Sequence, residues 1–163
     1  MKPPAFAVAG WKNSGKTTLV ERLVAEFRSR GLRVATVKRS HDAFLMDVEG
    51  TDTDRHRKAG AEAVVMVGPN GWSVARTGSE PSVDEVLDAL AGHDLVIAEG
   101  YKSSTLPILE VRGPGEGKSI AEGNPNVFAV ATDRPSNETH LPVHERDDVR
   151  ALADLAWQRV RPR

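Results

Sequence analysis

Residues 5–18 read AFAVAGWKNSGKTT, and they give the clearest indication of the fold class. Its first five residues are apolar and predict a short buried strand. The next eight, from Gly10 to Thr17, match the pattern G-x-x-x-x-G-K-[ST], in which the two glycines let successive backbone N–H groups face a phosphate. Apolar residues at helical spacing follow over 16–30, and a helix that starts at the loop directs its positive dipole end at the anion. Strand, loop and helix together predict a nucleoside triphosphate site.

The loop residues predicted to bind the nucleotide are Gly10, Trp11, Lys12, Asn13, Ser14, Gly15, Lys16 and Thr17. In this pattern the lysine reaches the β- and γ-phosphates, and the Thr17 hydroxyl is a ligand for Mg²⁺. A glycine-rich turn that only caps a helix is the alternative. The strand before the loop and the amphipathic helix after it favour the phosphate loop. A second Gly-Lys-Ser sequence at 117–119 lacks the first glycine of the pattern, because Arg112 stands there, and it predicts a glycine-rich loop instead.

Alternating strands and helices predict a single three-layer α/β domain over 1–163, with the P-loop NTPase fold. Further strands are expected over 33–37, 94–98, 107–111 and 127–131, and further helices over 82–90 and 147–160. Residues 63–67 and 72–75 flank Gly68-Pro69-Asn70-Gly71, which predicts an inserted β-hairpin. We expect the hairpin to add antiparallel strands, so that the sheet is mixed but mostly parallel. The segment 38–60 has no sustained apolar periodicity and predicts a long irregular loop.

Acidic and basic residues almost cancel, at 23 Asp and Glu against 22 Lys and Arg, for a formal net charge of -1. This balance argues against bulk attraction to nucleic acid or to an anionic membrane. No apolar run approaches the roughly 20 residues of a membrane helix, and the N-terminus lacks the apolar segment of a signal peptide. The chain has no cysteine, which excludes disulfides and thiolate metal sites. We therefore expect a cytoplasmic protein whose metal is magnesium on oxygen ligands.

A metal at the phosphate loop needs an acidic side chain from the end of another strand. Asp94 and Glu99 bracket one apolar strand. Because ligands bind at the carboxyl ends of parallel strands, Glu99 is the candidate to hold the metal through water, while Asp94 begins at the opposite edge. The alternative is that Glu99 is an ordinary surface acid at a strand end. Lys102 is a weaker candidate for a phosphate contact.

The charged segment 38–57 follows the second strand and therefore starts at the same edge of the sheet. Within it, Asp52 is a candidate to orient water or magnesium, and Arg55 and Lys38 are candidates for phosphate contacts. A solvated surface loop is the alternative. No spacing among the five histidines matches a metal-binding pattern, so a solvated or core imidazole is expected for each.

Four segments, 10–17, 38–41, 50–61 and 94–102, occur in the order found in the MobB family of molybdopterin-guanine dinucleotide biosynthesis adapter proteins. The run from Asp52 to Ala61 combined with Glu99-Gly100-Tyr101-Lys102 is much more specific than the phosphate loop alone. The chain resembles this family over most of its length. The resemblance implies a GTP-binding protein with magnesium and weak GTPase activity, usually a homodimer. It further implies action with the guanylyltransferase MobA, which attaches GMP to molybdopterin.

By the same resemblance, the phosphate cradle extends to Thr18, and Thr17 and Glu99 serve magnesium. Lys16, Asp52 and Arg55 are then the catalytic residues near the γ-phosphate. Asp133, at the end of the last expected strand, is a candidate to accept hydrogen bonds from N1 and the 2-amino group of guanine. The alternative for Asp133 is a turn residue ahead of Pro135.

Two other functions compete with the adapter. A small-molecule kinase could use the same loop, with the segment 38–57 binding the acceptor. Kinases usually close an arginine-bearing lid over the transferred phosphate, and no arginine-rich helix is predicted after Glu99. The third function is a non-hydrolysing module that only holds a cofactor phosphate.

Overall fold

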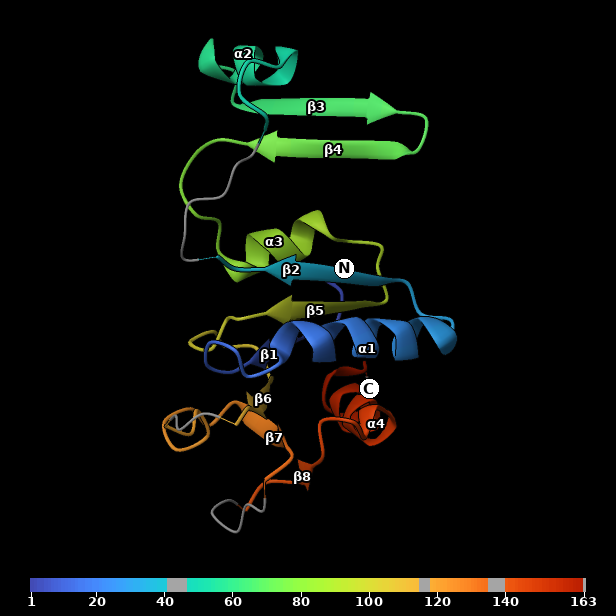
Figure 1. The fold of residues 1–163 in the computed structure, drawn as a ribbon. Helices are drawn as coiled ribbons and strands as arrows, with labels where there is room; N and C mark the ends of the chain where they lie inside the picture. The colour runs from blue at the N-terminus through green and yellow to red at the C-terminus, as the bar shows by residue number, and fades with distance from the viewer. Residues whose placement is uncertain (41–46, 115–117, 135–139, 163) are drawn as a thin grey trace. The chain divides into compact units, whose positions relative to one another are not determined.

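The computed structural model describes residues 1–40, 47–114, 118–134 and 140–162. The chain forms two compact units. The main unit comprises Met1–Arg39 and Val83–Arg163, and the inserted unit comprises Ser40–Ser82. Figure 1 shows both units as a ribbon coloured from the N-terminus to the C-terminus. The single nucleotide-binding domain expected over 1–163 stays a prediction.

A six-stranded sheet forms the centre of the main unit. Its strands are β1 (Ala5–Ala9), β2 (Val34–Lys38), β5 (Leu95–Glu99), β6 (Ile108–Arg112), β7 (Val127–Thr132) and β8 (Val143–His144). They lie in the order β2-β5-β1-β6-β7-β8, and each neighbouring pair is parallel. The arrowheads of β2 and β5 accordingly point the same way in Figure 1. The carboxyl ends of β1, β2 and β5 therefore meet at one edge of the sheet, where ligands bind in folds of this kind.

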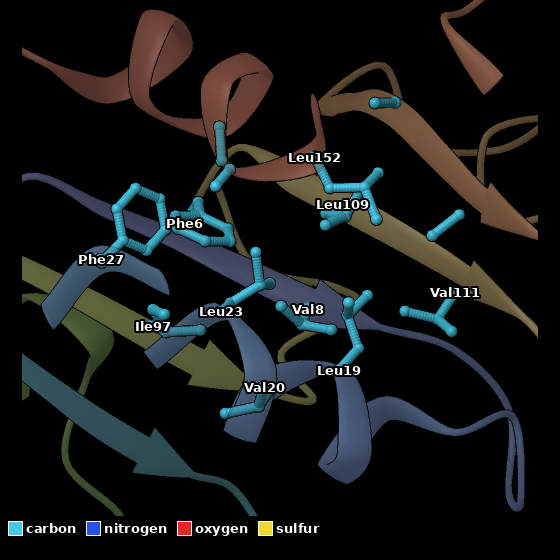
Figure 2. Close-up of a cluster of buried hydrophobic side chains, with 14 of the residues drawn as sticks. Phe6, Val8, Leu19, Val20, Leu23, Phe27, Ile97, Leu109, Val111 and Leu152 are labelled. Carbon is cyan, nitrogen blue, oxygen red and sulfur yellow. The ribbon is translucent and has the colours of Figure 1, made fainter. Parts of the chain in front are cut away.

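Helices cover both faces of this sheet. α1 (Lys16–Ser29) and α4 (Val149–Val160) pack on one face, and α3 (Val83–Ala89) packs on the other. The alternation along β1 explains this division, because Phe6 and Val8 face α1 and α4 while Ala7 faces α3. Figure 2 shows the cluster of buried side chains between the sheet and helices α1 and α4. In this cluster Phe27 of α1 packs edge to face on Phe6, with 6.2 Å between the ring centroids. Each fully buried side chain of this size stabilises the fold by about 1.5–3 kcal/mol.

The inserted unit holds α2 (Asp52–Lys58) and a hairpin of β3 (Ala63–Gly68) and β4 (Gly71–Arg76). The Thr51 side chain caps α2 by accepting a hydrogen bond from the Asp54 N–H. The buried Asp54 carboxylate accepts a hydrogen bond from the Gly50 N–H at 3.0 Å and lies 2.8 Å from Lys58 Nζ. The irregular loop predicted over 38–60 is therefore wrong for α2. This helix is stabilised by its cap and by ion pairs and not by the burial of an apolar face, so its sequence shows no apolar periodicity.

The hairpin and the P-loop fold class are confirmed, with one correction to the place of the hairpin. In the described residues β3 and β4 pair only with each other and form a separate antiparallel sheet, while the central sheet is parallel throughout. The partners Val65 and Val74, and Val67 and Trp72, share one face of the hairpin. All four side chains are exposed.

The other predicted elements are present, with their ends displaced by one or two residues. Strands predicted over 33–37, 94–98 and 107–111 each begin and end one residue later, and the strand predicted over 127–131 continues for one more residue. The helices predicted over 16–30, 82–90 and 147–160 are α1, α3 and α4. The sequence did not predict β8, because two residues are too few for a pattern.

Candidate nucleotide site

The loop between β1 and α1 is shaped by its glycines. Gly15, at the N-cap of α1, has a φ of +91°, a left-handed conformation that favours glycine. A Cβ at Gly10 would lie 2.3 Å from the carbonyl oxygen of Val111 in β6. Gly113, which no sequence motif marks, also packs on the loop, since a Cβ added there would lie 2.7 Å from Ser14 Cα. The loop is thus held against the end of β6 by close backbone contacts.

The structure brings the side chains of Thr17 and Glu99 together. The Thr17 hydroxyl donates a hydrogen bond to Glu99 Oε1 over 2.9 Å, and the Glu99 side chain is only 12% exposed. Leu95 and Ile97 of β5 pack against α1, and the strand alternation places Glu99 on the same face. Asp94 lies at the other end of β5, where hydrogen bonds from Arg33 lower the pKa of its carboxyl to about 2. Glu99 thus lies at the carboxyl end of β5 beside the phosphate loop, and its role at a metal stays a prediction.

The Thr17 and Glu99 oxygens fit a magnesium ion. A hydroxyl and a carboxylate are hard oxygen donors, which Mg²⁺ prefers, and it usually keeps water and phosphate oxygens as its other ligands. Among the described residues, no group of three or more His, Cys, Asp or Glu side chains could hold a metal by itself. Water and the phosphates of a nucleotide would complete the ligand set of a magnesium ion held here.

The loop also contains an orphaned donor that fits an anion site. Ser14 is 4% exposed, and within the described ranges its hydroxyl has no hydrogen-bond partner. A buried hydroxyl without a partner costs free energy, which an additional acceptor recovers. Asn13, with φ at +62°, and Thr18 are both exposed and accessible to a ligand.

Three lysines gather at this edge of the sheet. Lys16 Nζ donates to the Trp11 carbonyl oxygen at 2.6 Å, Lys38 Nζ lies 3.5 Å from Glu99 Oε1, and Lys102 Nζ lies 4.2 Å from the centroid of the Trp11 ring. Burial lowers the pKa of Lys16, the Glu99 charge opposes this effect, and the charges of Lys38 and Lys102 lower the pKa further. Lys38 and Lys102, predicted from sequence as phosphate contacts, thus lie beside the loop. This concentration of positive charge suits a polyphosphate.

Trp11 is half-exposed and connects the loop to a distant segment. Its indole N–H donates to the Lys118 carbonyl oxygen at 2.6 Å. The next residues are held by Glu110 of β6, a buried carboxylate that accepts hydrogen bonds from the Ile120 N–H at 2.9 Å and the Ala121 N–H at 3.1 Å. The sequence did not identify Glu110. Gly117 of the second Gly-Lys-Ser sequence, like residues 115–116 before it, lies outside the described residues.

Asp133 follows β7 and is joined to the phosphate loop through Arg146. The Asp133 carboxylate accepts hydrogen bonds from Arg146 Nε at 2.7 Å, from Arg146 Nη2 and from the Arg146 backbone N–H at 3.1 Å. Arg146 Nη1 donates to the Ser14 carbonyl oxygen at 3.3 Å. Hydrogen bonds from Arg146 lower the pKa of Asp133. The sequence missed Arg146, since no motif marks it.

Asp52 and Arg55 lie on α2 of the inserted unit. Arg55 Nη1 is 3.8 Å from Asp52 Oδ1, and both side chains are exposed. Their contact with the γ-phosphate stays a prediction. Asp54, between them, is the buried acid of this segment and was not identified from the sequence.

The fold and the site together define a P-loop protein of the α/β class. Strand β1 leads into a glycine-shaped loop that ends in Lys16-Thr17, helix α1 follows, and a carboxylate stands at the end of the neighbouring strand β5. Within the described ranges, no helix is long and apolar enough to cross a membrane. Residues 5–133 match the profile of MobB, molybdopterin guanine dinucleotide synthesis protein B. The chain belongs to the MobB family.

Relatives and a solved structure agree with this family. The chain is 33% identical to a molybdopterin-guanine dinucleotide biosynthesis adapter protein of Haemophilus influenzae over 81% of this chain and 76% of that protein. It is 31% identical to the adapter protein of Escherichia coli over 93% of this chain and 90% of that protein. The crystal structure of a MobB homolog from Bacillus stearothermophilus covers 98% of this chain and 99% of its own, with 27% identity and a TM-score of 0.71.

Proposed function

We propose that this protein is a GTP-binding adapter with slow GTPase activity in the synthesis of the molybdopterin guanine dinucleotide cofactor. Its candidate partners are the guanylyltransferase MobA and further molybdenum cofactor enzymes, and we place it in the cytoplasm, where GTP is available. Relatives from two bacteria carry the adapter name. The observation that carries nucleotide binding is the 2.9 Å hydrogen bond between Thr17 and Glu99 beside a complete phosphate loop.

The residues of the loop have separate roles in this proposal. Backbone N–H groups between Gly10 and Gly15, with the start of α1, bind the phosphates. Lys16 exchanges its bond to the Trp11 carbonyl for a bond to phosphate oxygens. Thr17 and Glu99 hold magnesium, which neutralises phosphate charge when it is bound.

Slow hydrolysis agrees with the state of Glu99. A general base must be free to accept a proton from water, whereas Glu99 already accepts a hydrogen bond from Thr17 and lies 3.5 Å from Lys38 Nζ. The remaining candidates to position water and to stabilise the γ-phosphate are Asp52 and Arg55.

The preference for guanine rests on the family. Guanine offers two donors, N1–H and the 2-amino group, where adenine offers none in the same geometry. The Asp133 carboxylate, the candidate acceptor for these donors, is 48% exposed but already accepts three hydrogen bonds from Arg146, so the preference is not assigned to this residue.

The homodimer is supported by the hairpin of the inserted unit. Val67 and Trp72 are 79% and 72% exposed, and they share their face with Val65 and Val74. A contiguous apolar face of this kind marks an association surface. Because such dimers are usually symmetric, the same face of a second copy is the occupant that we propose. Trp72→Asp should convert the dimer to a monomer in light scattering, while Met66→Lys, on the opposite face, should not. A monomeric wild-type protein would contradict the dimer.

Calorimetry with Mg·GTP and Mg·ATP tests which nucleotide the protein prefers. Phosphate release from GTP, measured with and without an acceptor, tests whether the protein hydrolyses GTP or transfers its phosphate. Slow release that no acceptor accelerates agrees with the adapter. Rapid stoichiometric phosphorylation of an acceptor would establish the kinase instead. The connection from β5 to β6 holds no helix and therefore no lid helix of the kind that a kinase uses. Tighter binding of Mg·ATP than of Mg·GTP would refute the proposal.

A further inference from the structure

Arg146 joins three parts of the main unit at one guanidinium group. It precedes α4, its Nε and Nη2 donate to the Asp133 carboxylate after β7, and its Nη1 donates to the Ser14 carbonyl oxygen in the phosphate loop at 3.3 Å. An arginine held on two of its nitrogen atoms by a carboxylate has a fixed orientation. The direction of the third nitrogen is therefore set by Asp133.

The contact with the loop depends on Gly15. A Cβ at Gly15 would lie 2.8 Å from Arg146 Nη1 and nothing else within that distance, so the guanidinium lies directly against the N-cap of α1. The Arg146 side chain is 30% exposed, which leaves part of its charge unscreened by water. A positive charge at this point adds to the helix dipole where the phosphates would bind.

The hydrogen bond to Ser14 also acts through the peptide group. In a trans peptide the C=O and the following N–H point in opposite directions, so a cation at the Ser14 oxygen polarises the Gly15 N–H on the other side. A polarised N–H is a stronger donor to an anion. The bond to Arg146 thus fixes the orientation of this peptide and strengthens its donor.

We propose that Arg146 is a positioning residue for the polyphosphate of the nucleotide, and that Asp133 acts as its anchor. The inference rests on the proposed nucleotide site and concerns phosphate only, so it applies to any base and to inorganic tripolyphosphate. Asp133 then contributes through Arg146, because its two oxygens already accept three hydrogen bonds from that residue.

The experiment compares Mg·GTP, Mg·XTP and Mg·tripolyphosphate by calorimetry on the full chain. The variants are Arg146→Gln, Asp133→Asn and the double substitution. We expect each single variant to lower the affinity for all three ligands by a similar factor of about tenfold, the effect of losing one charge-assisted hydrogen bond. The double variant should bind no more weakly than the weaker single variant, because both changes break the same connection.

Arg30→Gln is the matched control. Arg30 Nη1 lies 2.7 Å from Asp154 Oδ1 and likewise links α1 to α4, but at the far end of α1 from the loop. This variant should lower the melting temperature without changing ligand affinity. Melting curves of every variant without ligand show whether it is folded, and Asp133→Asn keeps the test open if Arg146→Gln does not fold.

Three results would overturn the inference. One is tripolyphosphate affinity that Arg146→Gln leaves unchanged. The second is an Asp133→Asn variant that loses GTP but gains XTP, which is the behaviour of a direct base reader. The third is a wild-type protein that binds none of the three ligands. Wild-type binding of tripolyphosphate without a preference for GTP would contradict the proposed function and leave the role of Arg146 supported if the variants behave as expected.

Discussion

The substitution Glu99→Gln distinguishes two possible roles of Glu99, as a carboxylate that helps to hold magnesium or as an ordinary acid at the surface. The substitution keeps the shape of a side chain that is only 12% exposed, and the glutamine oxygen can still accept the hydrogen bond of Thr17. What is lost is one negative charge beside the hydroxyl that would ligate magnesium. Loss of a residue that holds a metal through water lowers metal affinity by about 10- to 100-fold. The ratio of GTP affinities with and without magnesium should fall by that factor, or by about 1.4–2.8 kcal/mol.

The sign of the effect should reverse when magnesium is removed. Glu99 lies beside Lys38 and opposes the fall in the pKa of Lys16, so its charge also repels a metal-free phosphate. With EDTA, Glu99→Gln should therefore bind GTP at neutral pH at least as tightly as the wild-type protein does. Because the Glu99 charge raises the pKa of Lys16, its removal should also move the alkaline loss of GTP binding to lower pH.

Calorimetry with magnesium and with EDTA measures both effects. Asp94→Asn is the matched control, since it removes a carboxylate from the other end of the same strand, where it pairs with Arg33. The control should leave the magnesium dependence unchanged. An unchanged magnesium dependence in Glu99→Gln would show that Glu99 is an ordinary acid at a strand end and would remove the metal assignment.

Three other perturbations test the loop and the fold. Lys16→Ala should lower the affinity for Mg·GTP by at least about 100-fold, because the lysine is the charge nearest the β- and γ-phosphates. The melting temperature should change little, and unchanged affinity would contradict the nucleotide site. Gly113→Ala should destabilise the protein by about 1–3 kcal/mol and weaken nucleotide binding, because the new Cβ would lie 2.7 Å from the loop backbone, whereas Gly123→Ala has open space and should do neither. Hydrogen bonds from Arg33 lower the pKa of Asp94 from 3.8 to about 2, so its contribution to stability is complete above the unfolded pKa and is lost as the pH falls toward 2. The difference in melting temperature between the wild-type protein and Asp94→Asn should shrink over this range, and a constant difference would exclude the Asp94 pair as its source.

The sequence predicted what local patterns encode. The phosphate loop has a fixed spacing, and the apolar strand before Glu99 indicated which of two acids ends at the ligand edge. The sequence did not identify Arg146 as a site residue, because its partners Asp133 and Ser14 are 13 and 132 residues away along the chain. Glu110 was missed because no local pattern connects it with the backbone N–H groups of Ile120 and Ala121, which lie 10 and 11 residues further along the chain.

The inserted unit shows a different limit. α2 is stabilised by a buried aspartate and its cations, a device that leaves a polar sequence and therefore looks like a loop. The hairpin was visible in its turn residues, but turn chemistry determines only which two strands pair with each other. Whether a hairpin joins a larger sheet depends on free edges elsewhere in the fold, which no local pattern reports.

The position of β1 in the middle of the sheet has a consequence for how the chain folds. β1 is synthesised first, yet its neighbours are β5 and β6, with Ala5 beside Val96 and Ala7 beside Ile108. Such distant pairing slows folding, because the chain must close a long loop before the contacts form. The phosphate loop lacks its support at Val111 until β6 has been made. GTP at 100 times its dissociation constant would add about 2.7 kcal/mol to the stability of the folded state. The nucleotide would therefore favour the completed sheet, in which β1 can pair only after β5 and β6 have been synthesised.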